Sequence, residues 1–167
     1  MNPFIINLNT YTDTRGIFYE SYKNILLKEY NIDFNIEQEN TSISHKNVIR
    51  GFHYQVKPYS QAKLLTVLKG KIKDVLIDIR KTENTYGRIW EYELNSNIKQ
   101  LLYIPKGFAH GYSVLEDNTI VSYKTDALYN KDSERGFNPL SSTLNIDWKV
   151  NNRCISDKDI SLKTFIF

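Results

Sequence analysis

The feature that most constrains the fold is a series of short strand-like segments, each bounded by turn residues. They cover residues 36–43, 48–54, 63–68, 72–79, 89–94, 101–104, 112–115 and 119–125. About eight strands at such regular spacing are typical of an antiparallel jelly-roll sandwich or barrel. A tight turn at Lys69-Gly70-Lys71 is expected between two of them. The pattern therefore predicts a fold that is mainly all-β.

Only one segment has the periodicity of a helix. Within residues 21–30, Ile25, Leu26 and Tyr30 fall near one face, and Ser21 is placed to cap the start. Strands and helices do not alternate and no glycine-rich phosphate loop is present, so a dinucleotide-binding fold is not expected. The 12 Tyr and 8 Phe favour pleated sheet surfaces. The length of 167 residues suits a single jelly-roll domain over residues 1–167, with one or a few short helices.

Charge and cysteine content narrow the range of partners. The 22 Lys and Arg against 19 Asp and Glu give a net charge of only +3, and the basic residues are scattered, so no nucleic-acid partner is expected. The lone Cys154 excludes an internal disulfide and a cysteine zinc site, which favours a reducing, cytoplasmic location. Neither a signal-peptide pattern nor an apolar stretch near ~18 residues is present, so no membrane association is expected.

A polar strand gives the first indication of a functional site. His53 lies in Arg50-Gly51-Phe52-His53-Tyr54-Gln55, where a core strand would carry Val or Ile. Burying Arg, His and Gln together is costly unless they are paired or face a wet cavity, so the segment predicts a site. Strict alternation places Arg50 and His53 on opposite faces. If both serve one site, a bulge is needed between them, and Gly51 would permit it.

Other candidates are ambiguous from local sequence alone. His45 lies in a predicted turn and is interpreted as a surface residue, whereas His110 precedes a strand and is either a hydrogen-bonded turn histidine or a site residue. Tyr123 shares a strand face with Val121 and by itself would be a core aromatic. Lys63 opens a strand and by itself would be a solvated edge lysine.

A set of motifs runs in one order along nearly the whole chain, and the ordered set is specific although each motif is weak. The motifs occupy residues 13–18, 38–42, 50–55, 61–64, 78–80, 85–87, 104–111, 123–125, 134–136, 146–148 and 156–159. Residues 50–55, for example, match an Arg-Gly-Leu-His-Tyr-Gln motif. Through this set the chain resembles the dTDP-4-dehydrorhamnose 3,5-epimerase family, a group with a cupin-type jelly roll.

The resemblance implies roles for matching residues. His53 would be the general base, Tyr123 the general acid on the opposite sugar face, Asp159 the partner of His53, and Lys63 a cation near the ketone oxygen. The substrate and its diphosphate would be lined by Arg15, Glu20, Gln38, Asn40, Arg50, His110, Tyr129, Glu134 and Lys158. Family members are homodimers that exchange N-terminal strands, so the same assembly is expected.

The implied activity is epimerisation of a nucleotide-diphosphate-linked 4-keto-6-deoxy sugar, or of a related keto sugar such as a heptose, for surface-polysaccharide synthesis. Carbon 3, carbon 5 or both would be inverted through an enolate, with neither metal nor cofactor. Ala62 replaces a usual glycine, Lys149 follows Trp148 where the family often has proline, and the link from Trp148 to Asp159 looks short. These departures leave the identity of the sugar and of its nucleotide undetermined by the sequence.

Two rival interpretations differ in their chemistry. A metal-dependent cupin isomerase or oxygenase needs several closely placed ligands, but only His53 and His110 remain, and no glutamate lies between Gln55 and Gly70. The other rival is a non-catalytic cupin that binds a sugar nucleotide. The joint presence of His53, Tyr123 and Asp159 argues against it.

Overall fold

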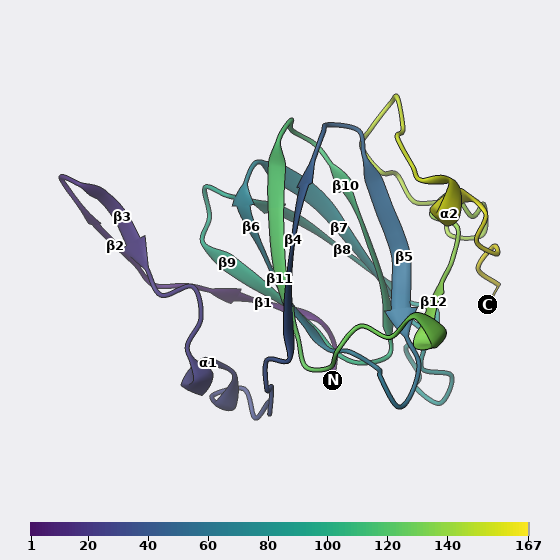
Figure 1. The fold of residues 1–167 in the computed structure, drawn as a ribbon, viewed down its shortest axis with the longest axis horizontal. Coiled ribbons are helices and arrows are strands. Elements are labelled where there is room, and N and C mark those ends of the chain that lie inside the picture. The colour runs from purple at the N-terminus through teal and green to yellow at the C-terminus, as the bar shows by residue number, and fades with distance from the viewer. Residues whose placement is uncertain (167) are drawn as a thin grey trace.

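Two five-stranded antiparallel sheets face each other in the computed structural model, which describes residues 1–166 (Figure 1). The first sheet has the order β1-β9-β6-β11-β4 and the second β12-β5-β10-β7-β8. Their bounds are β1 Phe4–Asn7, β4 Gln38–Ser44, β5 Ile49–Gln55, β6 Lys63–Lys69, β7 Lys71–Asp78, β8 Ile89–Asn95, β9 Gln100–Ile104, β10 Phe108–Val114, β11 Thr119–Thr125 and β12 Glu134–Gly136. The all-β, cupin-type jelly roll expected from the sequence is confirmed.

The remaining elements are short. Strands β2 (Thr10–Asp13) and β3 (Gly16–Tyr19) form a hairpin that projects away from the two sheets (Figure 1). Helices α1 (Asn24–Lys28) and α2 (Asp157–Ile160) and the 3-10 turn η1 (Lys131–Ser133) complete the fold. Within residues 1–166, no helix has the length and apolar character needed to cross a membrane.

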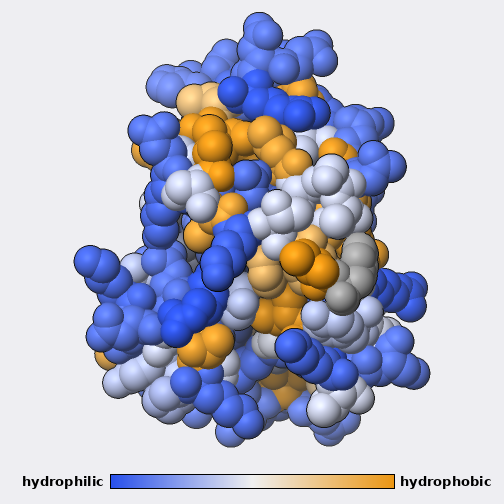
Figure 2. Space-filling model, turned by 90° about the vertical axis from the view of Figure 1, so that its right-hand side faces the viewer, coloured by the Kyte–Doolittle hydropathy of each residue, from blue (hydrophilic) through white to orange (hydrophobic). Residues whose placement is uncertain are grey.

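Apolar side chains form three layers. The core between the sheets packs Leu65, Leu102 and Val121 against Ile72 and Leu76. Segments near the two chain ends cover the outer faces. The N-terminal part of the chain, with Leu27, Ile32 and Phe34, packs on the first sheet, and the C-terminal part, with Trp148 and Phe165, packs on the second. Figure 2 shows the side that carries β5 and α2, where apolar groups remain exposed between hydrophilic ones.

The eight expected strands are all present, and Lys69-Gly70-Lys71 forms the expected tight turn, with Gly70 at φ +81°. The expected helix is wrong in extent and face. It covers only Asn24–Lys28, Lys23 rather than Ser21 takes the cap position, and Leu27 is the residue fully buried. A helix of one and a half turns is too short for its periodicity to decide which face packs. Strands β1, β2, β3 and β12 and helix α2 were not expected.

A bulge at Gly51 resolves the conflict between Arg50 and His53. On β5 these residues are three apart, yet they pair with Tyr112 and His110 of β10, which are two apart, so the register shifts between the two pairs. Gly51 has φ +109°, and a Cβ there would lie 2.5 Å from the carbonyl oxygen of His110. Only glycine fits such a close approach at this φ. Arg50 and His53 consequently line one cavity, and the bulge lies at Gly51, the residue that would permit it.

Candidate active site

A cavity of about 470 Å³ lies between the sheets and is lined only by polar and aromatic side chains. Eleven of the thirteen residues expected at the site contribute to it. They are Gln38, Asn40, Arg50, His53, Lys63, His110, Tyr123, Tyr129, Glu134, Lys158 and Asp159. Because β5 and β11 belong to opposite sheets, His53 and Tyr123 lie on opposite walls.

Asp159 joins helix α2 to strand β5. Its Oδ1 lies 2.7 Å from His53 Nε2, and its Oδ2 accepts a hydrogen bond from the Gly51 N–H at 3.2 Å. Ser156 caps α2 by accepting from the Asp159 N–H, which fixes the helix start beside β5. Burial alone would raise the pKa of Asp159, but the hydrogen bond and charge of His53 outweigh it and hold that pKa below its ordinary value. The carboxylate is therefore ionised and orients the imidazole.

The Lys63 Nζ and the Tyr123 hydroxyl both lack a hydrogen-bond partner among residues 1–166. The Lys63 Nζ lies 5.7 Å from the centre of the Tyr123 ring, and both side chains face the cavity from the first sheet. Burial lowers the pKa of Lys63 to about 8, although Asp74 and Glu134 partly oppose the change. Burial likewise raises the pKa of Tyr123 above its ordinary value, so the phenol keeps its proton.

His110 sits inside β10, not in a turn, and is only 6% exposed. Its Nε2 lies 2.8 Å from Oδ2 of the fully buried Asp74 on β7. Burial, with the nearby charges of Lys63 and His53, lowers the pKa of His110 below its ordinary value despite Asp74. Asp74 Oδ1 is the one buried side-chain oxygen or nitrogen within residues 1–166 that lacks a hydrogen-bond partner. Its negative charge helps Lys63 to stay protonated.

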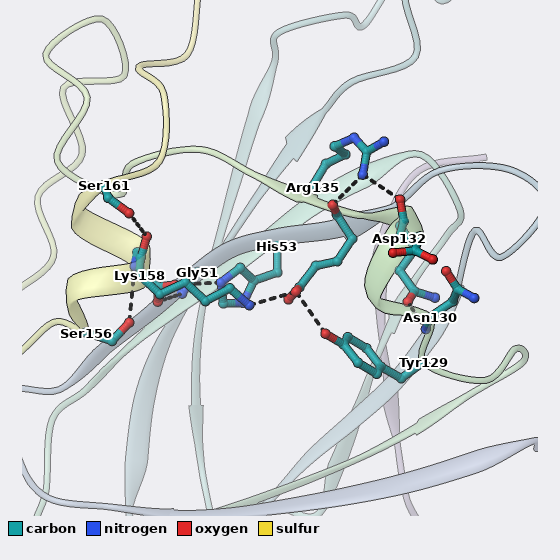
Figure 3. A network of polar contacts seen from close by, with 12 residues as sticks. Gly51, His53, Tyr129, Asn130, Asp132, Arg135, Ser156, Lys158 and Ser161 are labelled. Atoms are coloured by element: carbon teal, nitrogen blue, oxygen red, sulfur yellow. Dashed lines mark hydrogen bonds and ion pairs between the residues drawn. The ribbon is translucent and has the colours of Figure 1, made fainter.

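Tyr129 and Lys158 both contact the carboxylate of Glu134 on β12. The Tyr129 hydroxyl donates to Oε2 at 3.0 Å, and Lys158 Nζ lies 2.7 Å from the same oxygen. Figure 3 shows Lys158 of α2 and Tyr129 converging beside His53. Burial would raise the pKa of Glu134, but the hydrogen bonds from Lys158 and Tyr129 outweigh it, so that pKa is lowered.

The inner face of the edge strand β4 carries a polar row of Gln38, Asn40, Ser42 and Ser44. The Ser42 hydroxyl lies 2.8 Å from that of Tyr112, and Arg50 Nε donates to Ser44 at 3.1 Å. Four phenols line the cavity. Tyr112 is bonded to Ser42 and Tyr129 to Glu134, whereas Tyr54 and Tyr123 have no hydrogen-bond partner among residues 1–166. Because Tyr54 lies on β5 with His53, Tyr123 is the free phenol on the wall opposite His53.

Arg15 and Glu20, which were expected at the site, do not reach this cavity. Arg15 lies at the turn of the β2–β3 hairpin with its side chain 89% exposed and paired with Asp13, and Glu20 follows β3 and pairs with Lys23. The hairpin points away from the cavity of its own chain (Figure 1). His45 is exposed and outside the cavity, as expected from its turn.

The sequence did not single out several residues at the site. Six further residues line the cavity, namely Ser42, Tyr54, Gln55, Gln61, Tyr112 and Ser156. Asp74 was missed as the partner of His110, although an aspartate inside the apolar run of β7 is a signal of a buried polar pair. Ser42 continues the alternation of Gln38 and Asn40, and that period of two was the available signal.

The chemistry available to the cavity is proton transfer beside a cation. A carboxylate-paired histidine and a free phenol face each other, and an unpartnered ammonium lies beside the phenol. Across residues 1–166, no three His, Cys, Asp or Glu side chains group closely enough to hold a metal ion.

Comparison with known proteins agrees with this geometry. The chain is 40% identical over 164 residues to the dTDP-4-dehydrorhamnose 3,5-epimerase of Shigella flexneri, covering 97% of this chain and 90% of that protein. The Bacillus anthracis enzyme, solved with TDP and PPi bound, aligns with a TM-score of 0.95 at 36% identity over 98% of this chain and 94% of that one. The Legionella pneumophila enzyme in complex with dTDP-4-keto-L-rhamnose aligns with a TM-score of 0.92 at 38% identity, covering 97% and 87%. A family model described as dTDP-4-dehydrorhamnose 3,5-epimerase matches residues 2–166, so the chain belongs to that family.

Proposed function

We propose that this isomerase inverts carbon 3, carbon 5 or both of a nucleotide-diphosphate-linked 4-keto-6-deoxy sugar, or of a related keto sugar such as a heptose. The observation that carries the proposal is the placement of His53 and Tyr123 on opposite walls of one cavity, with the unpartnered Lys63 beside Tyr123. Relatives solved with TDP or with dTDP-4-keto-L-rhamnose bound support a nucleotide-linked keto sugar as the substrate.

We also propose a cytoplasmic location, because the single free Cys154 needs no oxidising compartment.

The proposed reaction begins with removal of a proton from the carbon beside the ketone. His53 Nε2 is engaged by Asp159, so Nδ1 is the free ring nitrogen that takes this proton. The C–H electron pair becomes the enolate double bond, and the ketone oxygen gains the negative charge. Lys63 stabilises that oxygen, a contact worth about 3 kcal/mol in comparable sites.

Inversion is completed from the opposite wall. The Tyr123 hydroxyl gives its proton to the same carbon on the other ring face, and the ketone re-forms. The imidazolium of His53 and the phenolate of Tyr123 are then reset by proton exchange with solvent. Every proton is accounted for within this cycle, which uses groups that line the cavity and protons exchanged with solvent.

The first experiment is incubation of chelator-treated protein with a panel of nucleotide-linked 4-keto sugars in deuterated water. NMR should show deuterium entering carbon 3 or carbon 5 of at least one sugar. His53→Asn should lower this exchange about 10²–10⁴-fold, because it removes the base. The matched control is His45→Asn, which changes an exposed histidine outside the cavity and should exchange at the wild-type rate. A wild-type protein that exchanges no sugar in the panel would instead favour a non-catalytic binding protein.

The role of Tyr123 predicts exchange without inversion. Tyr123→Phe removes one hydroxyl and little volume, so the sugar should still bind and His53 should still return a proton to the face it came from. Net inversion should fall at least about 100-fold while deuterium exchange with retention persists. The control Tyr112→Phe removes a hydroxyl that Ser42 already engages and should invert near the wild-type rate. Normal inversion by Tyr123→Phe would require a different acid.

Lys63 predicts an alkaline limit to the rate. Its pKa of about 8 in the ligand-free protein means that the ammonium is charged below pH 8 and neutral above it, so kcat/KM should fall as pH rises through 8. Tyr123 does not produce this limit, because burial raises its pKa above the ordinary value of 10. Lys63→Arg keeps its charge at these pH values, so the residual rate of that variant should stay level from pH 7.5 to 9.5. An identical alkaline fall in both proteins would assign it to another group.

We further propose a homodimer in which the β2–β3 hairpin enters the partner subunit. This assembly would cover the exposed Tyr11, Ile17 and Phe18 and would bring Arg15 and Glu20 to a substrate.

A complementation assay tests the exchange. Arg15→Ala and His53→Asn subunits should each be poorly active alone. After equal amounts are mixed, about a quarter of all cavities should be complete, because about half of the dimers are mixed and each mixed dimer holds one complete cavity. No recovery in verified mixed dimers would mean that each hairpin serves its own chain.

A further inference from the structure

Gln38 and Asn40 form a hydrogen-bonded pair at the end of β4, on the strand face that lines the cavity. The Tyr129 backbone N–H donates to Gln38 Oε1 at 2.8 Å, and Gln38 Nε2 donates to Asn40 Oδ1 at 2.8 Å. Both glutamine and asparagine side chains are half-buried cavity residues, and Asn40 lies directly opposite Tyr123 in the β4–β11 register.

The direction of this chain is fixed by its first donor. A backbone N–H can only donate, so the Gln38 atom that faces Tyr129 must be the oxygen. The Gln38 nitrogen then faces Asn40, whose nearer atom must be its oxygen, because two amide nitrogens cannot bond to each other. The amide nitrogen of Asn40 is consequently the atom left to the cavity. Within residues 1–166 it has no hydrogen-bond partner.

We propose that Gln38 is a positioning residue, which acts on the substrate through Asn40 by holding its amide with the nitrogen toward the bound nucleotide sugar. This inference rests on the proposed function. Asn40 then offers only donors, so it recognises an oxygen that accepts, either on the sugar or on the diphosphate. The link to the Tyr129 backbone also couples the orientation of Asn40 to the segment that follows β11.

A purely structural role fits the geometry less well. The pair is half-buried and lies on an edge strand that pairs only with β11, so its loss should cost little stability. A free asparagine amide has two nearly equal orientations, and only one of them presents the donors. Removing Gln38 should therefore weaken substrate binding through loss of orientation, with the Asn40 side chain still in place.

A double-mutant cycle tests whether Gln38 acts through Asn40. The proteins are wild type, Gln38→Met, Asn40→Ala and the double variant, assayed with dTDP-4-keto-6-deoxyglucose in deuterated water. Asn40→Ala should raise KM about tenfold and Gln38→Met about threefold, with kcat within about twofold of wild type. The double variant should match Asn40→Ala, because without the asparagine there is nothing left to orient. Multiplication of the two effects would show that Gln38 contacts the substrate itself and would overturn the proposal.

Gln38→Glu gives a second test that does not depend on the methionine variant folding. An ionised carboxylate accepts from the Tyr129 N–H but cannot donate to Asn40, whereas the protonated acid can. The KM ratio to wild type should therefore fall as pH is lowered from 7 to 4, through the ordinary glutamate pKa of about 4.3. Gln61→Glu adds the same charge to the cavity wall at another position and also loses the hydrogen bond that Gln61 Nε2 donates to the Ala127 carbonyl, so it measures the effect of a carboxylate that does not contact Asn40. Equal pH dependence in the two variants would overturn the orienting role.

Binding of dTDP and of inorganic pyrophosphate separates the two sources of the acceptor oxygen. If Asn40→Ala weakens binding of dTDP and of inorganic pyrophosphate in proportion to its rise in KM, the acceptor belongs to the diphosphate. If dTDP binding is unchanged while KM rises, it belongs to the sugar, and both results support a donor role. A KM unchanged by Asn40→Ala would refute this inference alone. A wild-type protein that exchanges none of the panel sugars would remove the proposed function and the inference with it.

Discussion

The carboxylate of Asp159 is the interaction on which the site depends. It accepts from His53 Nε2 and from the Gly51 N–H, so one side chain holds the imidazole and the bulged backbone beside it. The bulge in turn brings Arg50 and His53 to one face of β5. Because Asp159 lies on α2, residues more than 100 positions apart in the sequence must be assembled before the histidine is oriented. The site is therefore a product of the complete fold.

Some polar groups of the site are hydrogen-bonded to one another, and others have no hydrogen-bond partner among the described residues. Carboxylates and histidines are paired with one another, whereas the Lys63 ammonium and the Tyr123 hydroxyl are left without hydrogen-bond partners among the described residues. Unpaired polar groups in a half-buried site are costly, and burial favours their neutral forms. The pKa of Lys63 is therefore lowered and that of Tyr123 is raised. A substrate with a ketone between the walls would supply the missing partners. The cost of keeping these groups unpaired is thus recovered on binding.

The sequence predicted the central strands because each is a short strand-like segment with turn residues at its ends. It missed the β2–β3 hairpin, whose residues are nearly all exposed and so show no buried face. It also missed α2, because four residues are too few to show a helical pattern. His53 was identified physically, from the cost of burying its polar neighbours. Lys63 and Tyr123 locally resembled an edge lysine and a core aromatic, and only the ordered motifs selected them. Asp74 required knowledge of which strands are adjacent.

Strand β4 has a further consequence for how such a protein can change over generations. It lies at the edge of its sheet, and its cavity-facing row is polar, so substitutions there leave the apolar core between the sheets intact. The reacting groups, by contrast, stand on β5, β6 and β11, which are paired on both sides. In the proposed function, the part of substrate recognition that Gln38 and Asn40 supply and the proton-transfer groups therefore occupy strands with different tolerance to mutation. A lineage with this architecture can acquire new sugar preferences by drift along one strand while the proton-transfer machinery is retained.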